Sequence, residues 1–235
     1  MRRRISAQAM SRSLRVSEVF ESLQGEGPFC CRRALFVRLV GCNLRCPFCD
    51  TKYSLDPRSG RKLGIGGLVD RVAAGGYGLV VFTGGEPLLQ RSALNAAVEA
   101  LQVLEEPPLV QLETNGTLPP PEPREPLYSA YFVVSPKDVP VRVPGARTRP
   151  EWPGFARETG RAFFKFLVAG EDDVDAVEGW VEAHSVPRRL VYLMPLTREG
   201  MGAEALLEAH RRVARLALAR GFNFSPRMHL LLGLA

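Results

Sequence analysis

Cys42-Asn-Leu-Arg-Cys46-Pro-Phe-Cys49 places three cysteines at C-x₃-C-x₂-C spacing, directly after the apolar stretch Ala34–Val40. No cysteine follows Cys49 in the chain. A structural zinc site takes four protein ligands, whereas an iron–sulfur cubane held by three thiolates leaves one iron open to another ligand. The triplet therefore predicts a cluster with an open iron, carried on the loop that follows a buried strand.

Apolar stretches typical of strands recur on both sides of this loop and alternate with helical patterns. The alternation predicts an α/β fold with a parallel sheet, whose functional edge is formed by the carboxyl ends of the strands. Two stretches, Leu118–Pro126 and Pro140–Gly160, are rich in proline and are predicted to be loops. The predicted strands are Arg15–Glu21, Ala34–Val40, Leu79–Thr83, Leu109–Glu113, Ala130–Ser135, Ala162–Val168 and Arg189–Met194, and the predicted helices are Ile65–Ala74, Arg91–Leu104, Asp172–His184 and Ala203–Arg220.

Length and composition fit one domain that spans residues 1–235, in which residues 1–13 form a dispensable extension if Met10 is the true start. The net charge of +6 comes from dispersed basic residues, so direct nucleic-acid binding is not expected. No apolar run is long enough for a membrane span or a secretion signal, and we expect a cytoplasmic protein. All five cysteines lie within Cys30–Cys49, which favours a reduced metal site over a disulfide framework.

Polar motifs follow several of the predicted strands at the point where each strand ends. Thr83-Gly-Gly-Glu-Pro87, Glu113-Thr-Asn-Gly116 and Ser135-Pro-Lys137 all stand in this position. The paired glycines permit close approach of the backbone to a ligand, and Glu86 offers an acceptor for a ligand ammonium. Together with the cysteine loop, these motifs are expected to converge on one rim of the sheet.

Arg38 is a charged residue inside an otherwise apolar predicted strand, four residues before Cys42. If its side chain points inward it must meet an anion, because an unpaired buried guanidinium is costly and its fork suits a carboxylate. A solvent-facing Arg38, placed by strand alternation, is the alternative.

The cysteine triplet, followed downstream by Gly-Gly-Glu after a strand, resembles the radical S-adenosylmethionine (SAM) superfamily. Further motifs make the chain similar, over nearly its whole length, to the QueE family of 7-carboxy-7-deazaguanine synthases. These motifs are Leu23-Gln-Gly-Glu-Gly27, Arg38-Leu-Val-Gly-Cys-Asn-Leu44, Cys49-Asp-Thr51, Thr83-Gly-Gly-Glu-Pro87, Glu113-Thr-Asn-Gly116 and Ser135-Pro-Lys137.

The resemblance implies a lyase on a truncated TIM-type (β/α) barrel. Such an enzyme converts 6-carboxy-5,6,7,8-tetrahydropterin to 7-carboxy-7-deazaguanine with loss of ammonia, in queuosine-type 7-deazapurine biosynthesis. The implied cofactors are a [4Fe–4S] cluster, SAM and Mg²⁺, and the implied partners are a reducing protein such as flavodoxin or ferredoxin and a second copy in a homodimer. The cofactors carry the radical chemistry, and the protein contributes placement and exclusion of water.

The resemblance also implies roles for individual residues. Cys42, Cys46 and Cys49 would hold the cluster, and Thr51 would bind a magnesium ion that also meets the substrate carboxylate. For SAM, Met194 and Pro195 stand where the family commonly shows Gln-Pro-Met. The implied substrate residues are Leu23, Gln24, Gly25, Glu26, Arg38, Thr83 and the terminal carboxylate of Ala235, and the implied SAM residues are Phe48, Cys49, Asp50, Gly85, Glu86, Ser135, Pro136, Lys137, Met194 and Pro195.

Two functions of other classes remain open at this stage. A radical SAM activating enzyme that acts on a protein glycyl site shares the triplet, but it would not need Arg38 or Thr51 in these contexts. A zinc-stabilised binding module would take a fourth ligand from Cys30, Cys31 or His229. Otherwise Cys30 and Cys31 are interpreted as ordinary thiols.

Overall fold

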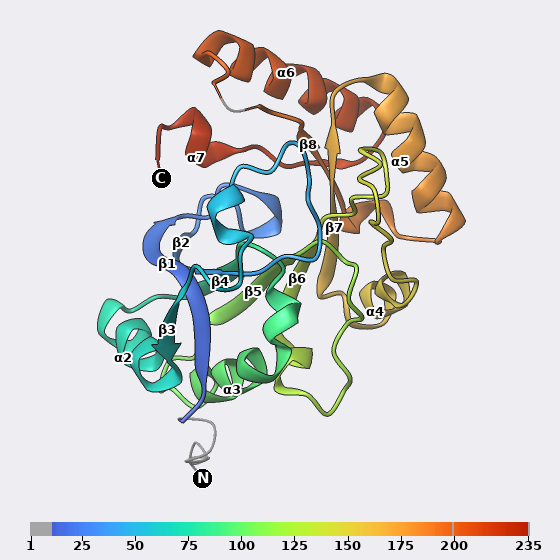
Figure 1. Ribbon diagram of the computed structural model, residues 1–235. Coiled ribbons are helices and arrows are strands. Elements are labelled where there is room, and N and C mark those ends of the chain that lie inside the picture. Colours follow the sequence, from blue (N-terminus) through green and yellow to red (C-terminus); the bar gives the residue numbers. More distant parts are fainter. Residues whose placement is uncertain (1–10, 199, 235) are drawn as a thin grey trace.

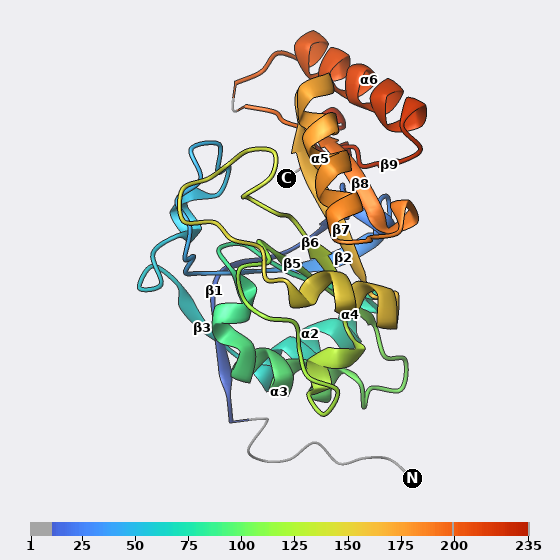
Figure 2. The ribbon, with the colours of Figure 1, turned by 90° about the vertical axis from the view of Figure 1, so that its right-hand side faces the viewer.

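The computed structural model describes residues 11–198 and 200–234, so the expectations about Met10 and Ala235 lie outside the described residues. Within them, nine strands form one sheet in the order β3-β1-β2-β4-β5-β6-β7-β8-β9. Neighbouring strands are parallel from β2 to β9, whereas β1 is antiparallel to both β2 and β3. The sheet curves into a partial barrel with its helices on the outside (Figures 1 and 2). The predicted α/β partial barrel is confirmed.

All seven predicted strands and all four predicted helices are present, with ends that differ by a few residues. The strands are β1 (Ser13–Leu23), β2 (Arg33–Leu39), β3 (Arg61–Gly64), β4 (Leu79–Thr83), β5 (Leu109–Thr114), β6 (Tyr131–Val134), β7 (Ala162–Val168), β8 (Val191–Pro195) and β9 (Asn223–Phe224). The helices are α2 (Ile65–Gly75), α3 (Arg91–Leu101), α4 (Glu151–Thr159), α5 (Glu171–Ala183), α6 (Ala203–Ala219) and α7 (Met228–Leu231). The short elements β3, β9 and α7 were not predicted.

The prediction of a loop over Pro140–Gly160 is wrong in its second half, where α4 forms. Pro153 lies in the first turn of this helix, where its missing N–H has no carbonyl to bond. Buried aromatic residues hold the helix against the sheet: Trp152 and Phe155 pack on each other with ring centroids 5.7 Å apart, and both contact Phe132 of β6. Tertiary packing of these rings therefore outweighs the local preference of a Pro-Gly pair.

The inner face of the curved sheet changes in character along the strands. Near the amino ends it is apolar, with Phe36 and Val81 in a small buried cluster and Phe20 stacked on Phe36 at 5.1 Å between ring centroids. Side chains alternate between the two faces of a strand, so the next inward positions toward the carboxyl ends are Arg38 on β2 and Thr83 on β4. The polar end of the barrel interior is therefore its carboxyl end, as the sequence predicts.

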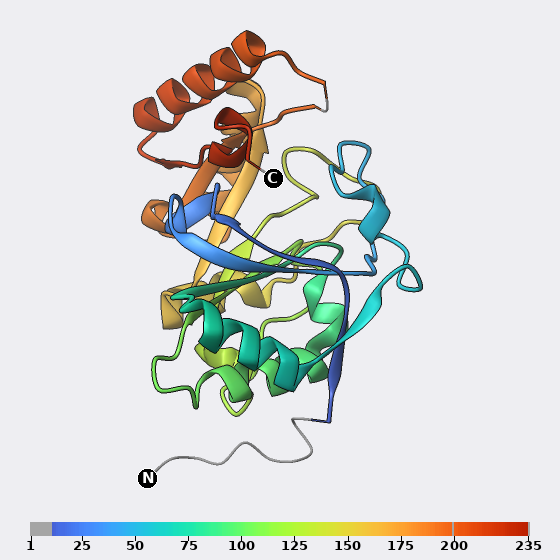
Figure 3. The same cartoon turned by 90° about the vertical axis from the view of Figure 1, so that its left-hand side faces the viewer.

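After β9 the chain returns to the end of β1, across the open side of the partial barrel. Here the C-terminal segment (residues 225–231) meets the Glu26 loop (residues 24–32), and α7 lies against β1 (Figure 3). Gly27 N donates to Ser225 Oγ at 2.9 Å, and Met228 N donates to Gly25 O at 2.9 Å. In the described part of the chain, no helix is long and apolar enough to cross a membrane.

Candidate active site

A cavity of about 280 Å³ opens at the carboxyl ends of the parallel strands. The cysteine loop (residues 41–51), the glycine turn (residues 84–88), the Glu26 loop and the C-terminal segment all contribute to its wall. The predicted convergence of the motifs on one rim is confirmed. The proposed site residues that line the cavity are Leu23, Gln24, Gly25, Glu26, Arg38, Cys42, Cys46, Phe48, Cys49, Asp50, Thr51, Thr83, Gly85, Ser135, Lys137 and Met194, whereas Glu86, Pro136 and Pro195 do not line it.

Glu86 departs from the expected role, because its carboxylate faces the protein interior and is fully buried. It accepts hydrogen bonds from Asn115 N at 2.7 Å, Thr114 Oγ1 at 2.8 Å and Leu88 N at 3.0 Å. Burial raises the pKa of Glu86, and these donors only partly offset it. The carboxylate therefore braces the ends of β4 and β5 and does not line the cavity.

The glycine turn packs directly on the start of the cysteine loop. Gly85 has a φ of +48°, and a Cβ on it would lie 2.1 Å from Gly41 O. Glu86 N donates to the same carbonyl at 2.8 Å. Only glycine allows this left-handed conformation and this approach without strain, so the turn fixes the cysteine loop relative to β4.

The three cysteines of the triplet are free thiols on the wall of the cavity. Leu44 N donates to Cys42 Sγ at 3.4 Å, and Cys49 Sγ lies 3.8 Å from Thr51 Oγ1. Burial raises the pKa of the Cys42 and Cys46 thiols. Three soft ligands that line one cavity, together with a glycine turn, fit a three-thiolate iron–sulfur cluster and the small molecule that completes it.

Cys30 and Cys31 lie on the Glu26 loop, and neither lines the cavity. Their Sγ atoms are 3.7 Å apart. No three His, Cys, Asp or Glu side chains of the described residues are grouped so that they could hold a metal ion. In a cubane each thiolate binds a different iron, so a triplet that serves a cluster need not converge on a single point.

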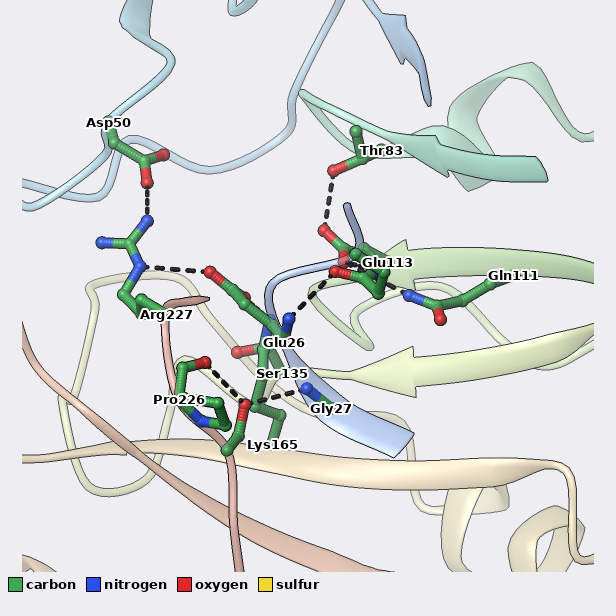
Figure 4. Close-up of polar contacts among 12 residues, drawn as sticks. Glu26, Gly27, Asp50, Thr83, Gln111, Glu113, Ser135, Lys165, Pro226 and Arg227 are labelled. Atoms are coloured by element: carbon green, nitrogen blue, oxygen red, sulfur yellow. Dashed lines mark hydrogen bonds and ion pairs between the residues drawn. The ribbon is translucent and has the colours of Figure 1, made fainter. Parts of the chain in front are cut away.

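Glu26 is the centre of a buried charge cluster that Figure 4 shows. Lys165 Nζ, from β7, donates to one carboxylate oxygen of Glu26, and Arg227 Nε, from the C-terminal segment, donates to the other at 3.1 Å. Burial alone would raise the pKa of Glu26, but the charges of Lys165, Arg227 and His229 outweigh it and hold that pKa below its usual value. Sequence reasoning missed Lys165, although it is a charged residue inside an apolar strand, which is the same signal that identified Arg38.

Glu113 is a second carboxylate on the cavity wall, and its bonded partners are neutral. It accepts from Thr83 Oγ1 at 2.8 Å, Gln24 Nε2 at 3.1 Å and Gln111 Nε2 at 3.3 Å (Figure 4). Below it, Gln111 is fully buried, and its Oε1 has no partner among the described residues. Thr83 and Gln24 are therefore oriented by Glu113, a residue that the sequence placed on the rim without a role.

Arg38 lines the cavity with only 18% of its side chain exposed, so the solvent-facing alternative is not observed. Its Nε donates to Glu18, which also accepts from Tyr53 Oη at 2.7 Å. The guanidinium lies 5.4 Å from the centroid of the Phe20 ring. The anion that the sequence required is thus present as Glu18, bonded through Nε.

Lys137 is a half-buried cation on the cavity wall. Its Nζ donates to Ser135 O at 3.0 Å and also to the Ser135 hydroxyl. Burial, together with the nearby charge of Lys165, lowers the pKa of Lys137 to about 8. A half-buried ammonium that is held by neutral acceptors can still bind an anionic ligand group.

A curved α/β sheet that carries a C-x₃-C-x₂-C loop after its first parallel strand, with a glycine turn after the next, defines a radical SAM protein. Residues 36–129 match the model of the radical SAM superfamily. Membership of this superfamily implies a [4Fe–4S] cluster and SAM.

Comparison of whole chains narrows the class further. The chain is 55% identical over 226 residues to the 7-carboxy-7-deazaguanine synthase of Hyperthermus butylicus, a match that covers 96% of this chain and 95% of that one. It is 40% identical over 220 residues to the enzyme of the same name from Pyrobaculum aerophilum, covering 93% and 94% of the two chains. The crystal structure of QueE from Escherichia coli shares the fold, with a TM-score of 0.70 at 24% identity over 92% of this chain and 95% of that one. The chain belongs to the 7-carboxy-7-deazaguanine synthase family.

Proposed function

We propose that this protein converts 6-carboxy-5,6,7,8-tetrahydropterin to 7-carboxy-7-deazaguanine with loss of ammonia, in queuosine-type 7-deazapurine biosynthesis. The observation that carries the proposal is the joint wall of one cavity: the cysteine triplet lines it together with Arg38, Thr83 and the Glu26 loop. A radical SAM activating enzyme for a protein glycyl site would not require these last three features. Family membership over nearly the full chain supports the same substrate.

The cluster and SAM would occupy the side of the cavity formed by the cysteine loop and the glycine turn. Cys42, Cys46 and Cys49 would hold the cluster; when bound, cluster and SAM supply the radical that removes and returns a substrate hydrogen. The SAM side of the wall would be formed by Phe48, Asp50, the Gly85 backbone, Ser135, Lys137 and Met194, all of which line the cavity. For Glu86, Pro136 and Pro195 the proposal is limited to backbone contacts or to support of neighbouring residues.

The pterin would lie on the opposite side, against Gln24, Gly25, Glu26 and Thr83. Arg38 bonds Glu18 through Nε, and the fork of a guanidinium carries further N–H donors on its terminal nitrogens. Those donors are suited to the substrate carboxylate, while the Arg38–Glu18 pair fixes the plane of the fork. Arg38 would thus be oriented by one carboxylate and bind a second.

Magnesium, oligomeric state and electron supply complete the proposal. Thr51 Oγ1 lies on the cavity wall beside Cys49 and would give a magnesium ion one hard oxygen ligand. The proposed working form is a cytoplasmic homodimer, each chain one domain with one continuous sheet, reduced by flavodoxin or ferredoxin. Light scattering after gel filtration measures the dimer directly.

The deciding experiment is anaerobic incubation of the reconstituted protein with SAM, Mg²⁺, reductant and 6-carboxytetrahydropterin, followed by mass spectrometry. Formation of 7-carboxy-7-deazaguanine with repeated turnover per SAM is expected. The Cys46→Ala variant is the matched control and should form none. SAM cleavage without any change of the pterin would contradict the proposed substrate.

A further inference from the structure

Glu26 is a carboxylate on the wall of the cavity that forms ion pairs with two cations. Only 8% of the residue is exposed, and cations reach it from two directions: Lys165 from β7 and Arg227 from the C-terminal segment. Lys165 donates to one of the two carboxylate oxygens, and Arg227 donates to the other, as Figure 4 shows for Arg227. An ionised carboxylate has about four acceptor positions, so each oxygen keeps one of them for another donor.

The ion pair is not explained by stability alone. A buried ion pair is often no more stabilising than well-packed apolar residues of similar volume, because both charges lose their hydration. Lys165 is the one charged residue of β7, whose other six residues are apolar. A lysine placed there, against a carboxylate on a cavity wall, indicates that the pair serves to keep the carboxylate ionised and in a fixed orientation.

Arg227 ties this carboxylate to other parts of the cavity wall. Besides Glu26, its guanidinium donates to Thr197 Oγ1 at 2.6 Å and to the carboxylate of Asp50. Its backbone N donates to Nε2 of the buried His210 at 3.0 Å, which fixes the start of the side chain. The same guanidinium thus spans the Glu26 loop and the cysteine loop.

We infer that Lys165 and Arg227 are positioning residues that hold Glu26 ionised and in one orientation, so that Glu26 accepts hydrogen bonds from two adjacent N–H groups of the substrate. The 2-amino and ring N–H groups of a pterin form such a pair, so the inference rests on the proposed function and deepens it. Lys165 and Arg227 act through Glu26 and need not touch the reacting atoms.

Several other charged or titratable groups surround Glu26, and the inference has to hold in their presence. His229 lies on the C-terminal segment, and Lys137 follows β6. Asp50 shares Arg227 with Glu26, Glu113 acts on Lys165 from β5, and Cys30 is on the same loop. Removing Lys165 leaves Glu26 with one bonded cation, Arg227, in a site where burial favours the protonated acid.

The test is calorimetric binding of 6-carboxytetrahydropterin to the anaerobically reconstituted, SAM-loaded protein without reductant, so that no turnover occurs. Lys165→Met should weaken binding on the order of 30-fold or more at neutral pH, and Lys165→Arg should restore most of it. The matched control is Arg33→Gln, which breaks an exposed ion pair with Glu21 and should bind like wild type.

A pH series separates positioning from a structural role. The pterin affinity of the Lys165→Met variant should fall progressively from about pH 9 to about pH 5, because Glu26 becomes protonated over this range. The affinity of the wild type should stay nearly constant over the same range. A structural defect would weaken binding by the same factor at every pH. Equal affinity of Lys165→Met and wild type across this range would overturn the inference.

Two further outcomes are possible. If Lys165→Met does not fold, the Arg227→Gln and Arg227→Lys pair carries the same test, with the same loss in the first and recovery in the second. If the wild type binds no pterin, the proposed function fails and the inference fails with it. A wild type that binds while all four variants bind equally well leaves the function standing and removes the positioning role.

Discussion

Two buried glutamates lie near the cavity in different settings: Glu26 lines it, whereas Glu86 lies behind its wall. On the side of the cysteine loop, Glu86 is bonded only by neutral donors, two backbone N–H groups and one hydroxyl. On the side of the Glu26 loop, Glu26 is bonded by the cations Lys165 and Arg227. Burial raises the pKa of Glu86, whereas the charges around Glu26 overcome burial and lower its pKa.

The difference separates two uses of a buried carboxylate. Neutral donors turn the carboxylate of Glu86 into a brace that joins the ends of two strands beneath the site. Cations keep Glu26 ionised at the surface of the cavity, where its remaining acceptor positions are available. The expected effects of substitutions therefore divide into a cluster side, a substrate side and the brace between them.

The largest expected effect is loss of the cluster. Cys42→Ala, Cys46→Ala and Cys49→Ala should each lose iron and sulfide, because a cubane held by two protein thiolates is not retained. Cys30→Ala and Cys31→Ala should keep a full complement. Iron and sulfide per chain are measured after anaerobic reconstitution. A full cluster in Cys42→Ala with loss in Cys31→Ala would reverse the assignment of the cluster side.

On the substrate side, Arg38→Ala should weaken pterin binding by about 2–5 kcal/mol and leave SAM affinity nearly unchanged. Glu18 keeps its bond from Tyr53 in this variant and is partly exposed, so the fold should tolerate the change. Both affinities are measured by titration calorimetry without reductant. Unchanged pterin affinity would mean that the substrate carboxylate is held by another group.

For the brace, Glu86→Ala should lower the free energy of unfolding by about 2–4 kcal/mol, because three donors lose their common acceptor in a buried site. Glu86→Gln should have a smaller effect, since the amide oxygen still accepts in place of one of the two carboxylate oxygens. Denaturant unfolding measures both, with Glu99→Ala on the exposed side of α3 as the control. Unfolding energies equal to wild type would show that the turn is held without the carboxylate.

The two glutamates should also give opposite pH dependences of stability. The pKa of Glu26 is depressed to about 2, so its contribution is present above the unfolded value near ~4.3 and is lost as pH falls through the folded pKa. The pKa of Glu86 is raised, so its contribution is present below ~4.3 and is lost as pH rises through the folded pKa. Urea unfolding of wild type, Glu26→Gln and Glu86→Gln at several acidic pH values compares the slopes. If the contributions of Glu26 and Glu86 to the free energy of unfolding changed with pH in the same direction, the two carboxylates would not differ as described.

The smallest expected effect belongs to Thr51. A hydroxyl is one neutral ligand among several, and magnesium retains waters that can fill a vacancy, so Thr51→Ala should raise the magnesium requirement without loss of the cluster. Thr51→Ser should behave like wild type. Turnover is followed against magnesium at saturating SAM and pterin. Coincident magnesium curves for wild type and Thr51→Ala would show that Thr51 is not a magnesium ligand.

The sequence by itself determined the cluster side of this protein. The cysteine triplet, the glycine turn and the motifs after β5 and β6 are each local in sequence, and each directly follows an apolar strand. Since parallel strands end at one edge, their positions in the chain are enough to bring them together. Arg38 was found in the same way, by a charge inside an apolar strand.

Only the tertiary structure decided which cations surround Glu26 and which way the Glu86 carboxylate points. Lys165 and Arg227 lie 139 and 201 residues from Glu26 along the chain, and they meet it because the sheet curves and the C-terminal segment returns to the end of β1. The inward direction of the Glu86 carboxylate likewise depends on two donors at the end of the neighbouring strand, Asn115 N and the Thr114 hydroxyl. Sequence pattern specifies which residues a strand presents, whereas the curvature of the sheet and the path of the C-terminal segment specify which charges become neighbours.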